Sequence, residues 1–169
     1  MASIRFAFLD PAECSMYTDR LFEILAGNMR KIAPTGASYE EDFAVWLPAF
    51  TAQIRQAERR VVLIFGSDTV VGYFQYSVGN NIFFMEDIQL APSYQGRYGI
   101  FRALYGFVIA GLPDTVTTVK AYAGKNNAKS IAVLTRLGLS VIGENKTGRS
   151  YVYEGTYADL LKWFHSKTD

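Results

Sequence analysis

The chain has 169 residues, of which 50% are hydrophobic and 20% are charged, and its formal net charge is +1. This composition is typical of a folded globular protein, and we expect one domain over residues 1–169. Long runs of Lys or Arg do not occur, so a nucleic-acid or anionic-membrane surface is not expected. Cys14 and His165, the single cysteine and the single histidine, are too few soft ligands for a zinc site.

The single cysteine and the hydropathy of the chain are typical of a cytoplasmic protein. One cysteine cannot form an internal disulfide, and this fits a reducing environment. The first ten residues are too polar for a secretory signal, and no apolar run approaches the ~18 residues that a membrane span needs. We therefore expect a cytoplasmic protein with no membrane partner.

The first third of the chain predicts a strand followed by two helices. Residues 2–9 alternate apolar and polar side chains, as a half-buried strand does. Asp10, followed by a proline, predicts the start of a helix that continues to about Lys31. Ser38 and Glu41 have the spacing of a capping box, which opens a second helix. Pro48 lies inside this helix, so we expect it to be kinked or split there.

The remaining elements predict a mixed sheet. Residues 61–65, 70–78 and 82–90 are expected to form an antiparallel meander with turns at 66–69 and 79–81. The helix that follows should stop at Gly111. Further predictions are a strand (116–122), a helix (127–137), a hairpin (139–144 and 150–154) and a final helix (156–167), for which a strand is the alternative. The predicted fold class is α/β, with a mixed, mostly antiparallel sheet flanked by helices.

A glycine loop separates the third strand of the meander from the next helix. It reads Gln95-Gly96-Arg97-Tyr98-Gly99. A loop of this kind gathers backbone N–H groups at the positive end of a helix dipole, which suits a phosphate or pyrophosphate. Considered alone, the loop also fits a plain α/β scaffold that holds a structural anion or nothing.

Two motifs resemble those of the GNAT superfamily of N-acetyltransferases. The first spans Glu86–Ile100, where a strand ends in an apolar-x-Pro turn and a Gln-x-x-x-Gly loop follows. The second is Asn-x-x-Ser at 127–130 with Leu-Gly-Leu at 137–139. The spacing of the motifs and the order of the elements also fit the family, so the resemblance covers roughly residues 4–154. It implies a GNAT-like fold and acetyl-CoA as acyl donor. No metal is expected, as the scarcity of soft ligands already indicated.

The sequence departs from the family pattern at three positions. The loop is one residue longer than usual, so the key glycine arrives at Gly99. Phe101 stands where the pattern has Gly or Ala. Leu134 occupies a position where many members carry a tyrosine that protonates the leaving thiolate. The resemblance therefore names no general acid, and Tyr122, Tyr151, Tyr153 and water remain alternatives.

The resemblance also implies roles for individual residues. The pantetheine arm would lie between strands 82–90 and 116–122 and pair with the backbone of Gln89 and Leu90. The Leu90 N–H would stabilise the oxyanion, and Glu86 is the candidate base, with a structural carboxylate as the alternative. Arg97 or Arg102 would add positive charge beside the pyrophosphate, and the alternative is that both are solvated surface residues. Asn127 would contact the cofactor, cap the helix, or do both. The implied cofactor-binding residues are Gln89, Leu90, Gln95, Gly96, Arg97, Tyr98, Gly99, Ile100, Phe101, Arg102, Asn127 and Ser130.

The acceptor is less well defined than the donor. The implied reaction is direct attack on the thioester by an amine of a small molecule or peptide. A catalytically silent acyl-CoA-binding sensor or interaction module is the alternative, and a homodimer is an option that the sequence leaves open. The first two helices and the later strands supply aromatic and acidic side chains that either line an acceptor pocket or serve the core and the surface: Tyr17, Tyr39, Phe43, Trp46, Tyr73 and Tyr76, with Glu40, Glu41 and Asp42.

Overall fold

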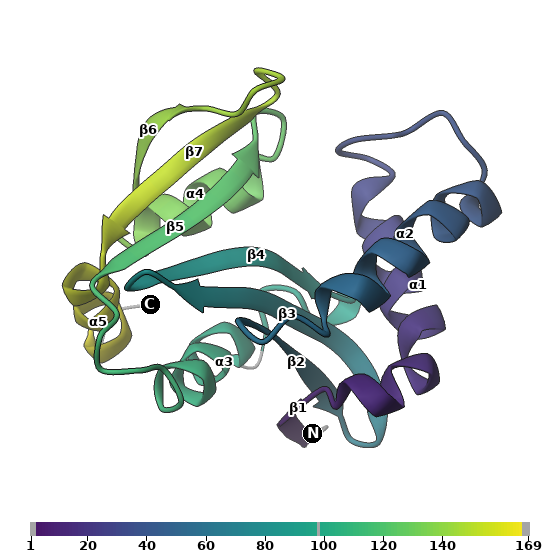
Figure 1. Cartoon of the computed structure of the whole chain (residues 1–169), viewed down its shortest axis with the longest axis horizontal. Helices are drawn as coiled ribbons and strands as arrows, with labels where there is room; N and C mark the ends of the chain where they lie inside the picture. The colour runs from purple at the N-terminus through teal and green to yellow at the C-terminus, as the bar shows by residue number, and fades with distance from the viewer. Residues whose placement is uncertain (1–2, 98, 167–169) are drawn as a thin grey trace. The chain divides into compact units, whose positions relative to one another are not determined.

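The computed structural model describes residues 3–97 and 99–166 (Figure 1). Seven strands hydrogen-bond in the order β1-β2-β3-β4-β5-β7-β6, which confirms the predicted mixed, mostly antiparallel sheet with helices. The elements, in chain order, are β1 (Ile4–Phe8), the 3₁₀ helix η1 (Pro11–Met16), α1 (Thr18–Met29), α2 (Tyr39–Gln53), β2 (Arg59–Gly66), β3 (Thr69–Gly79), β4 (Ile82–Leu90), the 3₁₀ helix η2 (Pro92–Tyr94), α3 (Ile100–Ile109), β5 (Thr118–Gly124), α4 (Ala128–Arg136), β6 (Ser140–Glu144), β7 (Ser150–Thr156) and α5 (Tyr157–His165).

The chain divides into two compact units, which are described separately. Unit 1 comprises Met1–Tyr76 and Asp87–Ile100, and unit 2 comprises Ser77–Glu86 and Phe101–Asp169. β3 and β4 therefore each contribute residues to both units. The assignment of residues 1–169 to a single domain stays a prediction.

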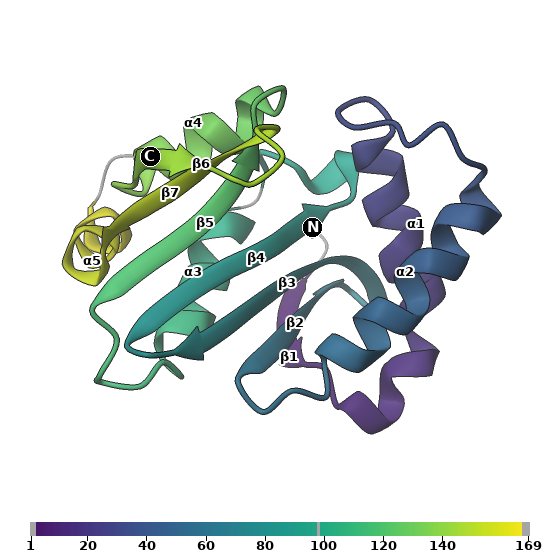
Figure 2. The same cartoon turned by 45° about the horizontal axis from the view of Figure 1, so that its top comes forward.

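In unit 1, two helices and η1 supply an apolar core around the N-terminal strands. β1 pairs antiparallel with β2, with Ile4 opposite Gly66 and Phe8 opposite Val62. α1 and α2 lie side by side in both views (Figures 1 and 2). Ala7 of β1 packs against a buried cluster from η1, α1, α2, β2 and β3. Its members include Cys14, Leu21, Ile24, Phe50, Ile54, Leu63, Phe65 and Tyr73.

The helices of unit 1 differ from the prediction in two places. The expected continuous helix from Asp10 to Lys31 is wrong, because the chain first forms the 3₁₀ helix η1 and α1 begins only at Thr18. The Tyr17 N–H still bonds to the Cys14 carbonyl, three residues back, at 3.0 Å. The Asp10 cap is confirmed by a 2.9 Å bond from the Ala12 N–H. α2 continues through Pro48, so the helix is not split there, and the kink, the other expected outcome, stays a prediction. Pro48 is exposed at least in part, so the carbonyl that loses its partner there can bond to water.

Unit 2 contains β5, β6 and β7, parts of β3 and β4, and the helices α4, α5 and most of α3. β5 pairs parallel with β4 over Ile82–Met85 and antiparallel with β7, and β6 pairs with β7 through an irregular register near Gly143. The last segment is the helix α5, as the sequence favoured, and its N-cap Thr156 accepts from the Asp159 N–H at 3.1 Å. Over the described part of the chain, no helix has the length and apolarity for a membrane crossing.

Candidate functional site

The end of β4, in unit 1, is the centre of the candidate site. The chain leaves the strand after Leu90, and the Ala91 N–H donates to the Val71 carbonyl of β3 at 2.8 Å. Backbone groups alternate along a strand, so the N–H and C=O of Leu90 point away from β3. The two strands approach closely here, because a Cβ placed on Gly72 would lie 2.4 Å from the Gln89 carbonyl oxygen.

The predicted glycine loop follows directly. Gly96 and Gly99 have φ values of +67° and +60°, which L side chains rarely adopt. The loop leads into α3 at Ile100, whose side chain is buried, while Arg97 is exposed. Tyr98, which belongs to the predicted cofactor-binding set, lies outside the described residues. The loop thus has the strand–loop–helix context that an anion site at a helix N-terminus requires.

A buried tyrosine anchors the first part of a polar network on β4. The Tyr73 hydroxyl donates to Asp87 Oδ2 at 2.7 Å, and Gln89 Nε2 donates to Asp87 Oδ1 at 2.6 Å. Burial first, and then the neighbouring carboxylate, raise the pKa of the Tyr73 hydroxyl well above its ordinary value. The hydroxyl therefore remains a donor, and both Asp87 oxygens are held from within unit 1.

The network continues through α1 to the glycine loop. Asn28 Nδ2 donates to Gln89 Oε1 at 3.0 Å and to the Leu90 carbonyl at 2.9 Å. Gln95 Nε2 donates to the same carbonyl at 2.9 Å and to Asn28 Oδ1 at 3.2 Å. The sequence reasoning missed Asn28. One signal was available, because Asn28 follows Leu21 by seven residues and Ile24 by four, on the buried face of α1.

This arrangement changes what the Leu90 backbone can offer a ligand. A carbonyl oxygen has two lone pairs, and two side-chain amides already use those of Leu90. The predicted pantetheine pairing had assigned both the N–H and the C=O of this residue to the cofactor. A ligand amide that donated to the carbonyl would have to displace Asn28 or Gln95, whereas the N–H faces no such competition from these side chains.

Three predicted site residues fall on β4 and α3 of unit 2. Glu86 is half-buried on β4. The Phe101 ring packs against Tyr105 and Trp163, with centroids 4.9 and 5.8 Å away. Arg102 Nη1 donates to the carbonyls of Trp163, Phe164 and Ser166 at 2.9, 2.6 and 3.0 Å. Arg102 thus caps the C-terminus of α5, and its phosphate contact stays a prediction.

The second motif begins α4. Asn127 Oδ1 accepts from the Ser130 N–H at 3.1 Å, which confirms its capping role. Leu134 is buried, with 7% of its surface exposed. Of the alternative general acids, Tyr122 is 53% exposed whereas Tyr153 is only 3% exposed. Tyr151 lies between these two in exposure, and which group protonates the thiolate stays open.

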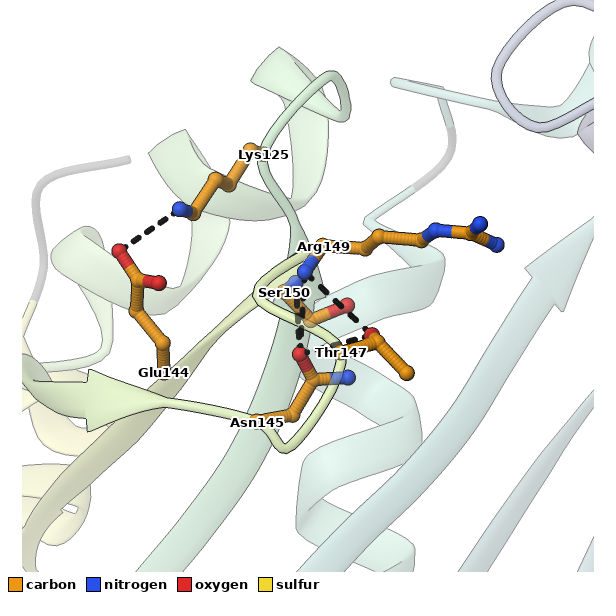
Figure 3. A network of polar contacts seen from close by, with 6 residues as sticks. All are labelled: Lys125, Glu144, Asn145, Thr147, Arg149 and Ser150. Carbon is orange, nitrogen blue, oxygen red and sulfur yellow. Dashed lines mark hydrogen bonds and ion pairs between the residues drawn. The ribbon is translucent and has the colours of Figure 1, made fainter.

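A hairpin turn holds the loop that precedes α4 (Figure 3). Asn145 Oδ1 accepts from the backbone N–H groups of Arg149 and Ser150, each at 3.1 Å. Lys125 Nζ lies 2.7 Å from Glu144, and the Lys125 N–H donates to the Arg149 carbonyl at 3.0 Å. In Figure 3 the Arg149 guanidinium extends away from the other labelled side chains. The turn therefore fixes the entry to α4, where Asn127 is the cap.

Most of the predicted acceptor-lining groups have structural partners. Trp46 stacks on Phe50 with centroids 4.6 Å apart, and Phe50 meets Tyr73 at 6.5 Å. Glu41 Oε2 accepts from the Ser38 N–H at 2.8 Å, which completes the predicted capping box and lowers the pKa of Glu41. Asp42 accepts from the Thr35 hydroxyl. Tyr39 is 39% exposed, and burial followed by the charges of Glu23, Asp19 and Glu40 raises its pKa.

No protein-family model matches the sequence, and no curated protein matches it. Solved structures do match. An acetyltransferase from Thermus thermophilus has a TM-score of 0.72 at 19% identity, over 92% of this chain and 99% of that chain. The PaiA N-acetyltransferase from Thermoplasma acidophilum, in complex with coenzyme A, has a TM-score of 0.67 at 16% identity, over 92% and 99%. A Desulfovibrio desulfuricans protein, named as an acetyltransferase of the GNAT family, has a TM-score of 0.66 at 17% identity, over 91% and 99%. The chain has the GNAT fold.

The GNAT fold was expected from two short motifs, and its recognition in the sequence is confirmed. At this level of identity the likeness concerns the fold, so the reaction and the residues that perform it have to be argued from the chain itself. Along this segment the described residues supply a strand N–H that points away from β3, a glycine loop and the start of α3.

Proposed function

We propose that this protein is an acetyl-CoA-dependent N-acetyltransferase that acts on an amine of a small molecule or a peptide. The end of β4 is the observation that carries the proposal. There the Leu90 N–H points away from β3, and a glycine loop leads from the same strand into α3. The GNAT fold supports the proposal, because the three solved structures described above are named acetyltransferases and one of these three is in complex with coenzyme A.

The proposed donor site uses backbone N–H groups first. The pyrophosphate would lie at the N-terminus of α3, against the N–H groups of Gln95 to Ile100. The exposed Arg97 would add positive charge. Arg102, whose Nη1 is committed to α5, is the weaker arginine candidate. Cofactor contacts by Asn127 and Ser130, which belong to unit 2, stay predictions of the second motif.

The proposed chemistry is a direct acyl transfer. The neutral amine nitrogen attacks the acetyl carbon, the carbon–sulfur bond breaks, and coenzyme A leaves as a thiolate that takes up a proton. The Leu90 N–H would donate to the oxygen that becomes negative in the tetrahedral intermediate. Glu86 would accept the proton from the amine, directly or through water. Holding both substrates together supplies much of the acceleration.

Binding of the donor is the first test. Calorimetry and thermal unfolding with acetyl-CoA should show one site and a raised melting temperature. Ligand at 100 times its Kd stabilises a protein by about 2.7 kcal/mol. ATP serves as the control for unspecific phosphate binding. An unchanged melting temperature at millimolar acetyl-CoA would contradict the proposal.

The second candidate function is acyl-CoA binding without catalysis. The buried Leu134 favours it, since no phenol stands at the position of the family's general acid. A panel of amines with detection of the released thiol separates the two candidates. In an active enzyme, Glu86→Gln should lower kcat/KM by about 100-fold near neutral pH. The exposed Glu58→Gln serves as the matched control. Unchanged turnover in Glu86→Gln would remove Glu86 as the base.

A further inference from the structure

Three groups form a closed ring of hydrogen bonds beside the proposed donor site. Asn28 Nδ2 and Gln95 Nε2 both donate to the Leu90 carbonyl at 2.9 Å, and Gln95 Nε2 also donates to Asn28 Oδ1 at 3.2 Å. With its bond to Gln89, Asn28 Nδ2 uses both of its hydrogens. Gln95 Nε2 uses both of its own, and the carbonyl uses both lone pairs. The ring has no spare donor and no spare acceptor at these three atoms.

Asp87 determines the direction of every bond in this ring. An ionised carboxylate only accepts, so Gln89 has to present its NH₂ group to Asp87 Oδ1. Gln89 then presents its oxygen to α1, and Asn28 has to answer with its NH₂ group. The oxygen of Asn28 consequently faces Gln95, which can only donate. The orientation of each amide follows from that of the one before it, and this series of hydrogen bonds ends at Gln95, the first residue of the glycine loop.

We infer that Asn28 is a positioning residue for acyl-donor binding: its amide, oriented from Asp87 through Gln89, holds Gln95 and the Leu90 carbonyl in the geometry that the donor meets. Asn28 does not itself touch the donor in this account. The inference rests on the proposed function, because it assigns the loop at 95–99 to the donor. Its new element is that α1, a helix outside both sequence motifs, holds the first residue of that loop in place through Asn28.

The hydrogen-bond donors of Asn28, rather than its size, distinguish the positioning role from a packing role. Asn28→Asp keeps the shape of the side chain but offers only acceptors, which would face Gln89 Oε1 and the Leu90 carbonyl. Neither partner can turn to donate, since Asp87 holds the Gln89 amide and a carbonyl has no hydrogen. Asn28→Ala merely takes one partner away from two acceptors and one donor. A packing role predicts that Asp is tolerated better than Ala, and the positioning role predicts the reverse order.

The experiment measures acetyl-CoA affinity by calorimetry and amide exchange of Gln95, Gly96 and Arg97 in the ligand-free protein. Asn28→Ala should weaken affinity about fivefold and Asn28→Asp by a further factor of about five. Both should speed exchange of the loop amides, in the same order. Arg30→Ala, which removes an exposed side chain at the end of the same helix, is the control and should change neither quantity.

The two measurements separate this inference from the proposed function. Loop exchange that is unchanged in both Asn28 variants overturns the inference, and so does better binding by Asn28→Asp than by Asn28→Ala. Wild-type protein that fails to bind acetyl-CoA overturns the proposed function and the donor role of Asn28 together. The predicted order of exchange rates in that case would still show that Asn28 positions the loop.

Discussion

Tyr73→Phe removes one hydroxyl from the core of unit 1 and takes a hydrogen-bond donor away from a carboxylate oxygen. The Tyr73 side chain is fully buried, and its hydroxyl lies 2.7 Å from Asp87 Oδ2. Hydrogen bonds to charged groups contribute about 1.5–3 kcal/mol, so we expect the free energy of unfolding to fall by about 2 kcal/mol. For a protein of this length that corresponds to about 4–8 °C in melting temperature.

Urea unfolding followed by far-UV circular dichroism measures this loss, and the chain contains a matched control. Tyr105 is equally buried, but its hydroxyl donates to the Met85 sulfur at 2.9 Å. A thioether is a weak acceptor, so Tyr105→Phe should cost less than about 1 kcal/mol. Equal losses in the two variants, or a loss below about 0.5 kcal/mol in Tyr73→Phe, would show that the carboxylate does not depend on this bond.

Two further predictions concern alkaline pH and the end of α5. Burial raises the pKa of Tyr73 and Tyr105, so the folded protein keeps both protons where an unfolded tyrosine ionises. Their contribution to the free energy of unfolding is intact below about pH 10 and falls above it by about 1.4 kcal/mol per pH unit for each group. Urea midpoints that stay level from about pH 10 to about pH 11.5 would contradict this. Arg102→Ala should cost about 1–2 kcal/mol, because three carbonyls at the end of α5 lose this donor. Arg102→Lys should recover only part of it, and unchanged amide exchange in α5 would refute the assigned cap.

Local sequence signals predicted most of the fold. The capping box at Ser38 and Glu41 and the cap at Asn127 are short-range hydrogen-bond patterns, and the structure contains them. The first two helices depart from these local rules in two places, since α2 is not split and the first helix is not continuous. Pro48 lies on a partly exposed helix face, where water can replace the missing partner, and Tyr17 divides the first helix at a point that no proline or glycine marks.

The candidate site was less accessible to sequence reasoning, for a physical reason. Backbone features such as the glycine loop follow from residue type and could be located. The side-chain network could not, because Asn28 and Gln89 are 61 residues apart in sequence and meet only when α1 packs against β4. Arg102 shows the same limit. Its bond to the Trp163 carbonyl, 61 residues further along the chain, could not be predicted from local sequence, and its contact with a phosphate stays a prediction.

Gly72 limits how such a site can diversify. A methyl group at this position would lie 2.4 Å from the Gln89 carbonyl oxygen and 2.8 Å from Leu90 Cδ2, so it would displace the end of β4. Directed evolution towards a new acceptor would therefore find no viable side chain at position 72, although it adjoins the strand that bears Leu90.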